Sequence, residues 1–120
     1  MRKGPVPAKA IGVALPAALV RGFVVLCQRN TSSEIDLIIA GPGLTAIVCI
    51  CRTKTLNESP EVLEAQFGNL IAVLRRVPHC PGRSCEIWAC DYYGNVRFFR
   101  LKKEGIEEIG RDGNPLGGPG

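Results

Sequence analysis

The chain has 120 residues, a formal net charge of +4 and 46% hydrophobic residues, so it has room for one domain and enough apolar content for one hydrophobic core. No apolar run reaches the roughly 18 residues that a membrane-spanning helix needs, and we expect no membrane association. The modest basic excess is compatible with a polyanionic partner such as nucleic acid, and equally with plain solubility.

The first elements expected along the chain are a loose terminus and a helix. Residues 1–7 are basic and contain two prolines, which predicts a flexible N-terminus. Residues 8–21 favour a helix by composition, although Pro16 predicts a break or a late start. Gly22 suits the end of this helix because glycine adopts the left-handed conformation at little cost. Two basic residues before an apolar stretch imitate a secretory signal, but no small-residue cleavage site follows, which favours a cytoplasmic protein.

Three apolar segments come next and predict strands. Phe23 to Cys27 forms the first, and Glu34 to Ala40 with Leu44 to Arg52 forms a hairpin around Gly41-Pro42-Gly43. Both hairpin strands are almost continuously apolar, which indicates burial on both faces. A sheet covered on both faces requires helices on both sides, so the pattern favours an α/β fold.

A second helix is predicted after Ser59, a good N-cap, with Pro60 at the first helical position. Its apolar residues form one helical stripe: Leu63, Phe67, Leu70, Ile71 and Leu74. Pro78 ends this helix. Its length is that of a crossover connection, which would return the chain parallel to the preceding strand.

A last hairpin is predicted from Cys85 to Asp91 and Val96 to Leu101, turning at residues 92–95. The remainder is charged and then rich in glycine and proline, so residues 104–120 are expected to be a flexible tail. The predicted domain spans residues 8–103. Its fold class is α/β, with a mixed five-stranded sheet flanked by two helices in the order helix-strand-strand-strand-helix-strand-strand.

This order, together with the motif Glu34-Ile35-Asp36-Leu37-Ile38 before a turn and an apolar strand, resembles the endonuclease-like core of the PD-(D/E)xK superfamily. Over residues 10–101 the chain is similar to small archaeal and bacterial proteins related to Holliday-junction resolvases. The resemblance implies a Mg²⁺ ion held by an aspartate and a second carboxylate, with a lysine that activates water. The carboxylate and the lysine lie two residues apart on one strand, so that both face the same site.

The resemblance assigns roles to individual residues and shows a departure from the family pattern. Asp36 matches the metal-binding aspartate, with Glu34 as the acid beside it, whereas Cys49 and Cys51 stand where the second carboxylate and the lysine belong. Thiols are soft ligands and poor partners for magnesium. Lys54 could serve as a displaced catalytic lysine.

We therefore expect a nuclease-related, catalytically degenerate module that binds nucleic acid or a protein. The interpretation that it is not an enzyme is favoured over the opposite one. Such a module would need no cofactor. Two alternatives stay open. One is an active Mg²⁺-dependent endonuclease or resolvase with Asp36 as metal ligand, and the other is a disulfide-stabilised structural or assembly protein without catalysis.

Binding residues follow from the same hypothesis. Candidate contacts to the phosphates of DNA or RNA are Arg52, Lys54, Arg75 and Arg76, because lysine and arginine supply most such contacts. A homodimer is a further possible assembly. The aromatic residues of the last hairpin would form either a base-stacking surface or cross-strand packing: Trp88, Tyr92, Tyr93, Phe98 and Phe99.

The six cysteines allow three interpretations. Strand cysteines commonly act as small buried hydrophobes. A disulfide is favoured between Cys80 and Cys85, whose short proline-glycine loop could bring the ends together. Zinc is the third option, held by Cys49, Cys51 and the two loop cysteines, or by three of these with His79.

Overall fold

A computed structural model describes residues 8–27, 35–53, 56–78 and 80–116, and within them the chain forms three helices and six strands. The helices are α1 (Ala8–Arg21), α2 (Pro60–Gln66) and α3 (Gly68–Leu74). The strands are β1 (Phe23–Leu26), β2 (Leu37–Gly41), β3 (Leu44–Arg52), β4 (Arg83–Cys90), β5 (Val96–Leu101) and β6 (Ile106–Ile109). They make one sheet in the sequential order β1 to β6.

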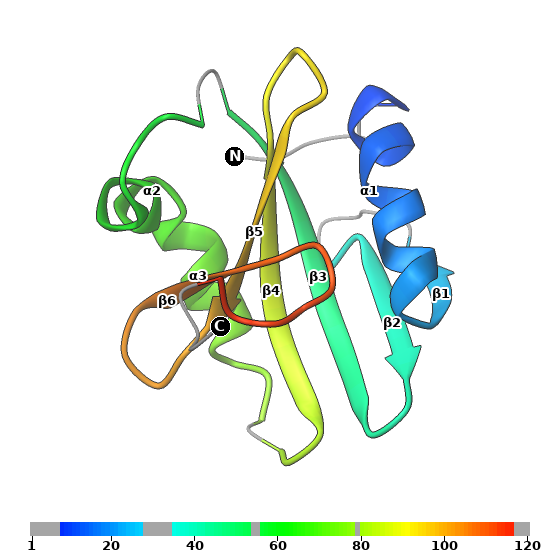
Figure 1. The fold of residues 1–120 in the computed structure, drawn as a ribbon. Coiled ribbons are helices and arrows are strands. Elements are labelled where there is room, and N and C mark those ends of the chain that lie inside the picture. The colour runs from blue at the N-terminus through cyan, green and yellow to red at the C-terminus, as the bar shows by residue number, and fades with distance from the viewer. Residues whose placement is uncertain (1–7, 28–34, 54–55, 79, 117–120) are drawn as a thin grey trace.

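The sheet is mixed, as the sequence predicts. Neighbouring strands are antiparallel except β3 and β4, which are parallel. The α2–α3 segment connects these two strands, because a parallel pair needs a crossover. Helix α1 covers one face of the sheet, and α2 and α3 cover the other (Figure 1).

Burial on both faces explains the apolar sequences of β3 and β4. Towards α1, the core contains the small residues Ala14, Ala17 and Ala18, which let the helix approach the sheet closely. Towards α2 and α3, Phe67 and Leu70 pack on the alternate strand residues. The core therefore has two halves separated by the sheet, as expected for an α/β layer arrangement.

The structure corrects the predicted number of elements. A sixth strand, β6, lies within residues 104–120, and a bridge joins Ile109 to Pro115. Ile109 is 1% exposed and belongs to the α1 half of the core. Its burial stabilises β6 although the surrounding sequence is polar. The second helix is divided at Phe67, whose backbone (φ −91°, ψ 12°) ends α2 before Gly68 begins α3.

Two expectations about the first helix are also corrected. Helix α1 continues through Pro16 without a break, and the carbonyl that loses its usual donor belongs to Gly12, which is exposed to water. Gly22 is not left-handed. Glycine is needed there because a Cβ atom would lie 2.5 Å from the carbonyl oxygen of Ala40.

Candidate functional site

The structure places Asp36 where strand β2 begins. Its side chain is buried, and its backbone N–H donates to the carbonyl of Val48 at 2.9 Å. That bond is one residue out of step with the register of β2 and β3, in which Val48 lies opposite Leu37. In addition, the Asp36 carboxylate accepts a hydrogen bond from the N–H of Ile50 at 2.5 Å. The carboxylate thus binds β3 at the residue between Cys49 and Cys51.

The two cysteines that the sequence resemblance puts in place of a carboxylate and a lysine point towards α2 and α3. Cys49 is fully buried, and Cys51 is partly buried against the same cluster. Arg52, the next residue, is exposed, and its guanidinium lies 4.8 Å from the ring centroid of Tyr92. The structure therefore brings Asp36 to the section of β3 that contains the two cysteines. The thiols themselves pack in the apolar core under α2 and α3.

This donor set does not fit Mg²⁺. A hard ion prefers oxygen ligands, and two of the three positions carry sulfur. Within the described residues, no three side chains of histidine, cysteine, aspartate or glutamate are grouped so that they could hold a metal ion. Glu34, Lys54 and His79 lie outside the described residues, so their predicted roles, and a zinc site that includes His79, stay predictions.

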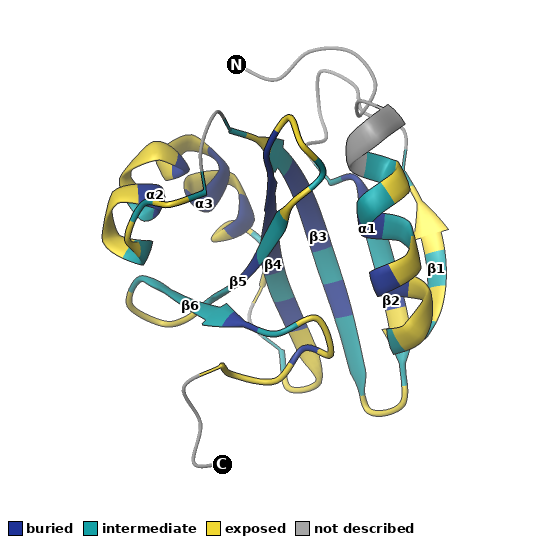
Figure 2. Cartoon of the chain, turned by 45° about the horizontal axis from the view of Figure 1, so that its top comes forward, coloured by how far each residue is buried: buried dark blue, intermediate teal, exposed yellow. Residues whose placement is uncertain are grey.

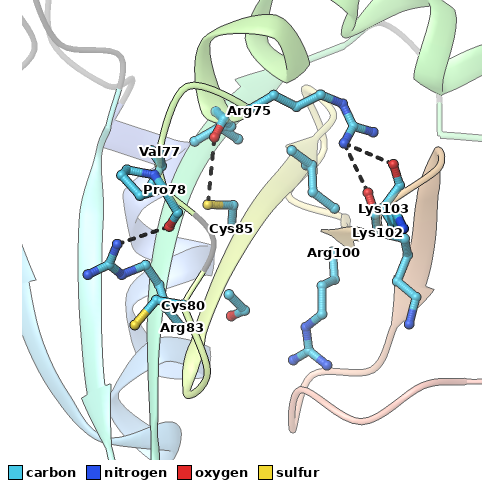
Figure 3. A pocket seen from close by; sticks show the side chains of 12 residues that line it. Arg75, Val77, Pro78, Cys80, Arg83, Cys85, Arg100, Lys102 and Lys103 are labelled. Atoms are coloured by element: carbon cyan, nitrogen blue, oxygen red, sulfur yellow. Dashed lines mark hydrogen bonds between the residues drawn. The ribbon is translucent and has the colours of Figure 1, made fainter.

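A different part of the surface forms a half-open hollow, which we call the basic cleft. It has a volume of about 900 Å³. The cleft lies between the end of α3, the loop before β4, the start of β4 and the turn between β5 and β6 (Figure 3). The described residues that line it are twelve: Leu74, Arg75, Val77, Pro78, Cys80, Arg83, Ser84, Cys85, Arg100, Leu101, Lys102 and Lys103.

Positive charge dominates this cleft. Five of the described lining residues are cationic and none is acidic. Arg75 reaches across the hollow and donates to the carbonyl oxygens of Lys102 and Lys103 at 3.0 and 3.4 Å (Figure 3). Arg83 donates to the carbonyl of Pro78 at 3.2 Å. Carbonyl oxygens carry no formal charge, so these bonds orient the guanidinium groups without neutralising them.

Two of the cations do have acidic partners just outside the lining. Lys102 Nζ lies 3.4 Å from Glu107 Oε1 at the surface, where such a pair contributes little. Arg100 Nη2 lies 3.5 Å from the buried carboxylate of Glu86 and donates to the carbonyl of Gly113 at 2.8 Å. The described residues that line the cleft themselves still include five cations and no acid.

The predicted phosphate contacts are only partly gathered at this place. Arg75 lines the cleft, and Arg76 is exposed beside it but does not line it. Arg52 is far away, because β3 and β4 are parallel: Thr45 pairs with Arg83 at the cleft, whereas Arg52 pairs with Cys90 at the other end. Arg83, Lys102 and Lys103 could not be singled out by their charge alone, because their segments meet only through the crossover between β3 and β4.

The predicted disulfide partners both line the cleft. All six cysteines belong to the described residues and are free thiols in this structure, so Cys80 and Cys85 are not bonded. The Cys85 thiol lies 4.0 Å from the carbonyl oxygen of Leu74. Its pKa is raised by burial, an effect that the nearby Arg83 opposes. Burial likewise raises the pKa of Cys90, to about 11.

A buried ionic network, which the sequence interpretation missed, supports the cleft from behind. Glu86 is fully buried in β4 and receives two parallel hydrogen bonds from Arg21, Nη1 to Oε1 at 2.8 Å and Nη2 to Oε2 at 2.9 Å. Ser84 Oγ and Trp88 Nε1 donate to the same carboxylate at 2.9 and 3.0 Å. Burial opposes ionisation of Glu86, but the bonds and charge of Arg21 outweigh it and lower the pKa of Glu86.

One feature of the sequence could have indicated this network. Glu86 is a lone acid inside an apolar strand, and it pairs with Arg100 across β4 and β5. A buried charge requires a partner of opposite sign. The pairing identifies Arg100 as one partner, whereas Arg21 is 65 residues away along the chain.

The aromatic residues of the last hairpin mostly support the packing interpretation. Trp88, Phe98 and Phe99 are buried. Trp88 and Phe98 pack edge to face with ring centroids 4.8 Å apart. Tyr92 and Tyr93 are exposed at the turn, outside the basic cleft.

No helix among the described residues is long and apolar enough to cross a membrane. Comparison of the chain with protein-family models, with curated proteins and with solved structures found no match. The α/β class and the mixed sheet are therefore features of this structure itself, and kinship with the endonuclease-like superfamily stays a prediction from the sequence.

Proposed function

We propose that this chain is a non-catalytic module that binds nucleic acid through the phosphate backbone, with the basic cleft as its binding site. The observation that carries the proposal is the charge of the lining: five cationic side chains and no acid among the described residues around a hollow of about 900 Å³. Arginine and lysine supply most protein contacts to phosphate oxygens.

The lining also indicates how the ligand would be recognised. None of the twelve described lining residues is aromatic, so these residues offer no platform on which bases could stack. Recognition would rest on phosphate charge and would be independent of sequence and strongly dependent on salt. The guanidinium of Arg75, oriented by backbone carbonyls on the far side of the hollow, is pre-positioned for such a contact.

The absence of catalysis is supported by the residues at the family's active positions. Asp36 is buried and its carboxylate accepts the N–H of Ile50, while Cys49 is enclosed by the α2 and α3 core. Thiols in place of the carboxylate and the lysine neither hold magnesium well nor carry a positive charge. An active Mg²⁺-dependent nuclease is the alternative, and the same experiment separates the two.

The test measures binding of mixed-sequence DNA and RNA by fluorescence anisotropy, with the double variant Arg83→Glu and Lys103→Glu. We expect the wild-type chain to bind these nucleic acids, and the affinity of the double variant to be lower by a factor of about ten or more. Arg52→Glu is the control, because this exposed cation lies at the opposite end of β3. Equal affinity of the wild type and the double variant would overturn the proposed site.

Incubation of the same substrates with Mg²⁺ or Mn²⁺ completes the test. We expect no cleavage. Cleavage that disappears in Asp36→Ala would instead establish the nuclease alternative.

A further inference from the structure

Strand β1 presents an exposed apolar edge. It is the terminal strand of the sheet and, in the described part of the chain, pairs only with β2. Phe23, Val25 and Leu26 are 72%, 46% and 56% exposed. Leu19 and Val20, in the last turn of α1 just before this strand, are 58% and 80% exposed. Figure 2 shows β1 as an exposed strand at the end of the sheet away from α2 and α3.

The exposure follows from the way the helices cover the sheet. Val24 packs against the core under α1, so its neighbours Phe23 and Val25 point to the opposite face. The residues paired with them on β2, Ala40 and Ile38, share that face and are exposed or only partly buried. The α2 and α3 half of the core takes its strand residues from β3, β4, β5 and β6, and so does not reach β1.

Two features that often keep edge strands from pairing, a charged side chain and a proline, are absent from this four-residue strand. Among the described residues, Arg21 is two positions before the strand, and its side chain is 7% exposed and bound to Glu86 inside the molecule. Its charge is therefore not available to repel a second strand.

The exposed apolar surface at this edge approaches in extent what an interface needs, and it is divided between the two faces of the sheet. Phe23 and Val25 lie on the face opposite α1, and Leu19 and Val20 lie on α1 itself. Five side chains at about 100 Å² each give on the order of 500 Å², and pairing along the strand edge would cover apolar residues on both faces. A standard interface buries about 800 Å² on each partner, and the backbone of β1 and the flank of α1 would supply the remainder.

The backbone of β1 fits one register of self-pairing. The N–H of Cys27 donates to the carbonyl of Asp36 in the adjoining strand, so by the period of two the polar backbone groups of Val25 and Phe23 also point inward to β2. Those of Val24 and Leu26 point outward, away from the sheet. Antiparallel pairing with Val24 opposite the same residue of a second copy would use these outward groups.

We propose that a second copy of this chain docks on β1, which would join the two sheets into one about a two-fold axis. The register centred on Val24 places Phe23 opposite Val25 of the second copy. The two-fold axis repeats this pair with the copies exchanged, and equivalent faces of the two sheets lie on the same side. Aromatic and β-branched residues are favourable cross-strand partners. Because the strand carries no charge, two chains of net charge +4 meet here without local repulsion.

The test is the mass of the full chain in solution, by light scattering after size exclusion and by sedimentation equilibrium. We expect a dimer of twice 12.9 kDa that dissociates on dilution. The double variant Phe23→Lys and Val25→Lys should be a monomer with an unchanged circular dichroism spectrum. Val62→Lys, at another exposed apolar residue on α2, should stay a dimer.

A second measurement uses the wild-type chain alone, so that misfolding of a variant cannot obscure the result. Hydrogen exchange of the Val24 and Leu26 amides should be slow at high protein concentration and faster on dilution. A monomeric wild-type chain, with another segment or another partner covering β1, would overturn the proposal. So would a dimer that the double variant leaves intact, or exchange at these amides that is independent of concentration.

Discussion

Arg21, the last residue of α1, donates two parallel hydrogen bonds of 2.8 and 2.9 Å to Glu86 in β4. The pair joins the first helix to the centre of the sheet across one half of the core. Arg100, which lies 3.5 Å from the same carboxylate, also lines the basic cleft. The ion pair therefore connects the position of α1 with a wall of the proposed binding site.

We expect Glu86→Gln to lower the free energy of unfolding by about 3 kcal/mol, because it leaves the buried guanidinium of Arg21 without its counter-charge. Urea unfolding at pH 7 measures this. Glu107→Gln is the matched control, since the surface pair of Glu107 with Lys102 contributes at most about 1 kcal/mol. Equal effects of the two substitutions would show that the buried pair has no special weight.

The same pair predicts a dependence of stability on pH. The pKa of Glu86 is lowered in the folded chain from its ordinary value of 4.5, so its carboxylate stabilises the fold above that pH, and this stabilisation is lost as the pH falls through the lowered value. We expect the stability difference between wild type and Glu86→Gln to be largest near pH 7 and to shrink below pH 4.5. Urea titrations at several pH values measure it, and a difference independent of pH would contradict the assignment.

Two glycines near the first helix should respond in opposite directions to alanine. Gly22→Ala would place a Cβ 2.5 Å from the backbone oxygen of Ala40, and we expect a loss of about 3 kcal/mol from this overpacking. Gly12 has open space around its Cβ position and is exposed within α1. Gly12→Ala should raise the stability by about 0.5 to 1 kcal/mol. Thermal unfolding compares the two, and a harmless Gly22→Ala would contradict the close backbone approach.

Much of the fold was predictable because its signals are local. The continuous apolar character of β3 predicted burial on both faces, and the Gly41-Pro42-Gly43 turn predicted the hairpin; Gly43 has the positive φ of 72° that favours glycine. Strand β6 was missed because its two apolar residues, Ile106 and Ile109, stand in a charged segment, and their burial depends on β5 beside them.

The candidate site was less accessible to prediction than the fold. Asp36 meets β3 at Ile50, between Cys49 and Cys51, because β2 pairs with β3 directly after it; the functional role expected for these three residues stays a prediction. The basic cleft could not be predicted because its cations come from segments whose meeting depends on the crossover between β3 and β4. Of the expected phosphate contacts that the structure describes, Arg75 lines it, whereas Arg52 and Arg76 do not.

Asp36→Ala should separate a structural role of this carboxylate from a catalytic one. We expect a loss of about 2 kcal/mol in stability, because the buried N–H of Ile50 loses its charged acceptor. Nucleic-acid affinity under conditions where the variant is folded should be unchanged. Unfolding and anisotropy titrations measure the two, and a specific loss of binding with intact stability would place Asp36 in the binding site.

The salt dependence of binding tests the central claim most directly. A plot of the logarithm of the association constant against the logarithm of salt concentration gives the number of phosphates that the protein neutralises. We expect the slope to become shallower by about 2 in the double variant Arg83→Gln and Lys103→Gln, one unit for each lost phosphate contact. Arg52→Gln should leave it unchanged. Identical slopes for the wild type and the double variant would show that the basic cleft does not hold the nucleic acid.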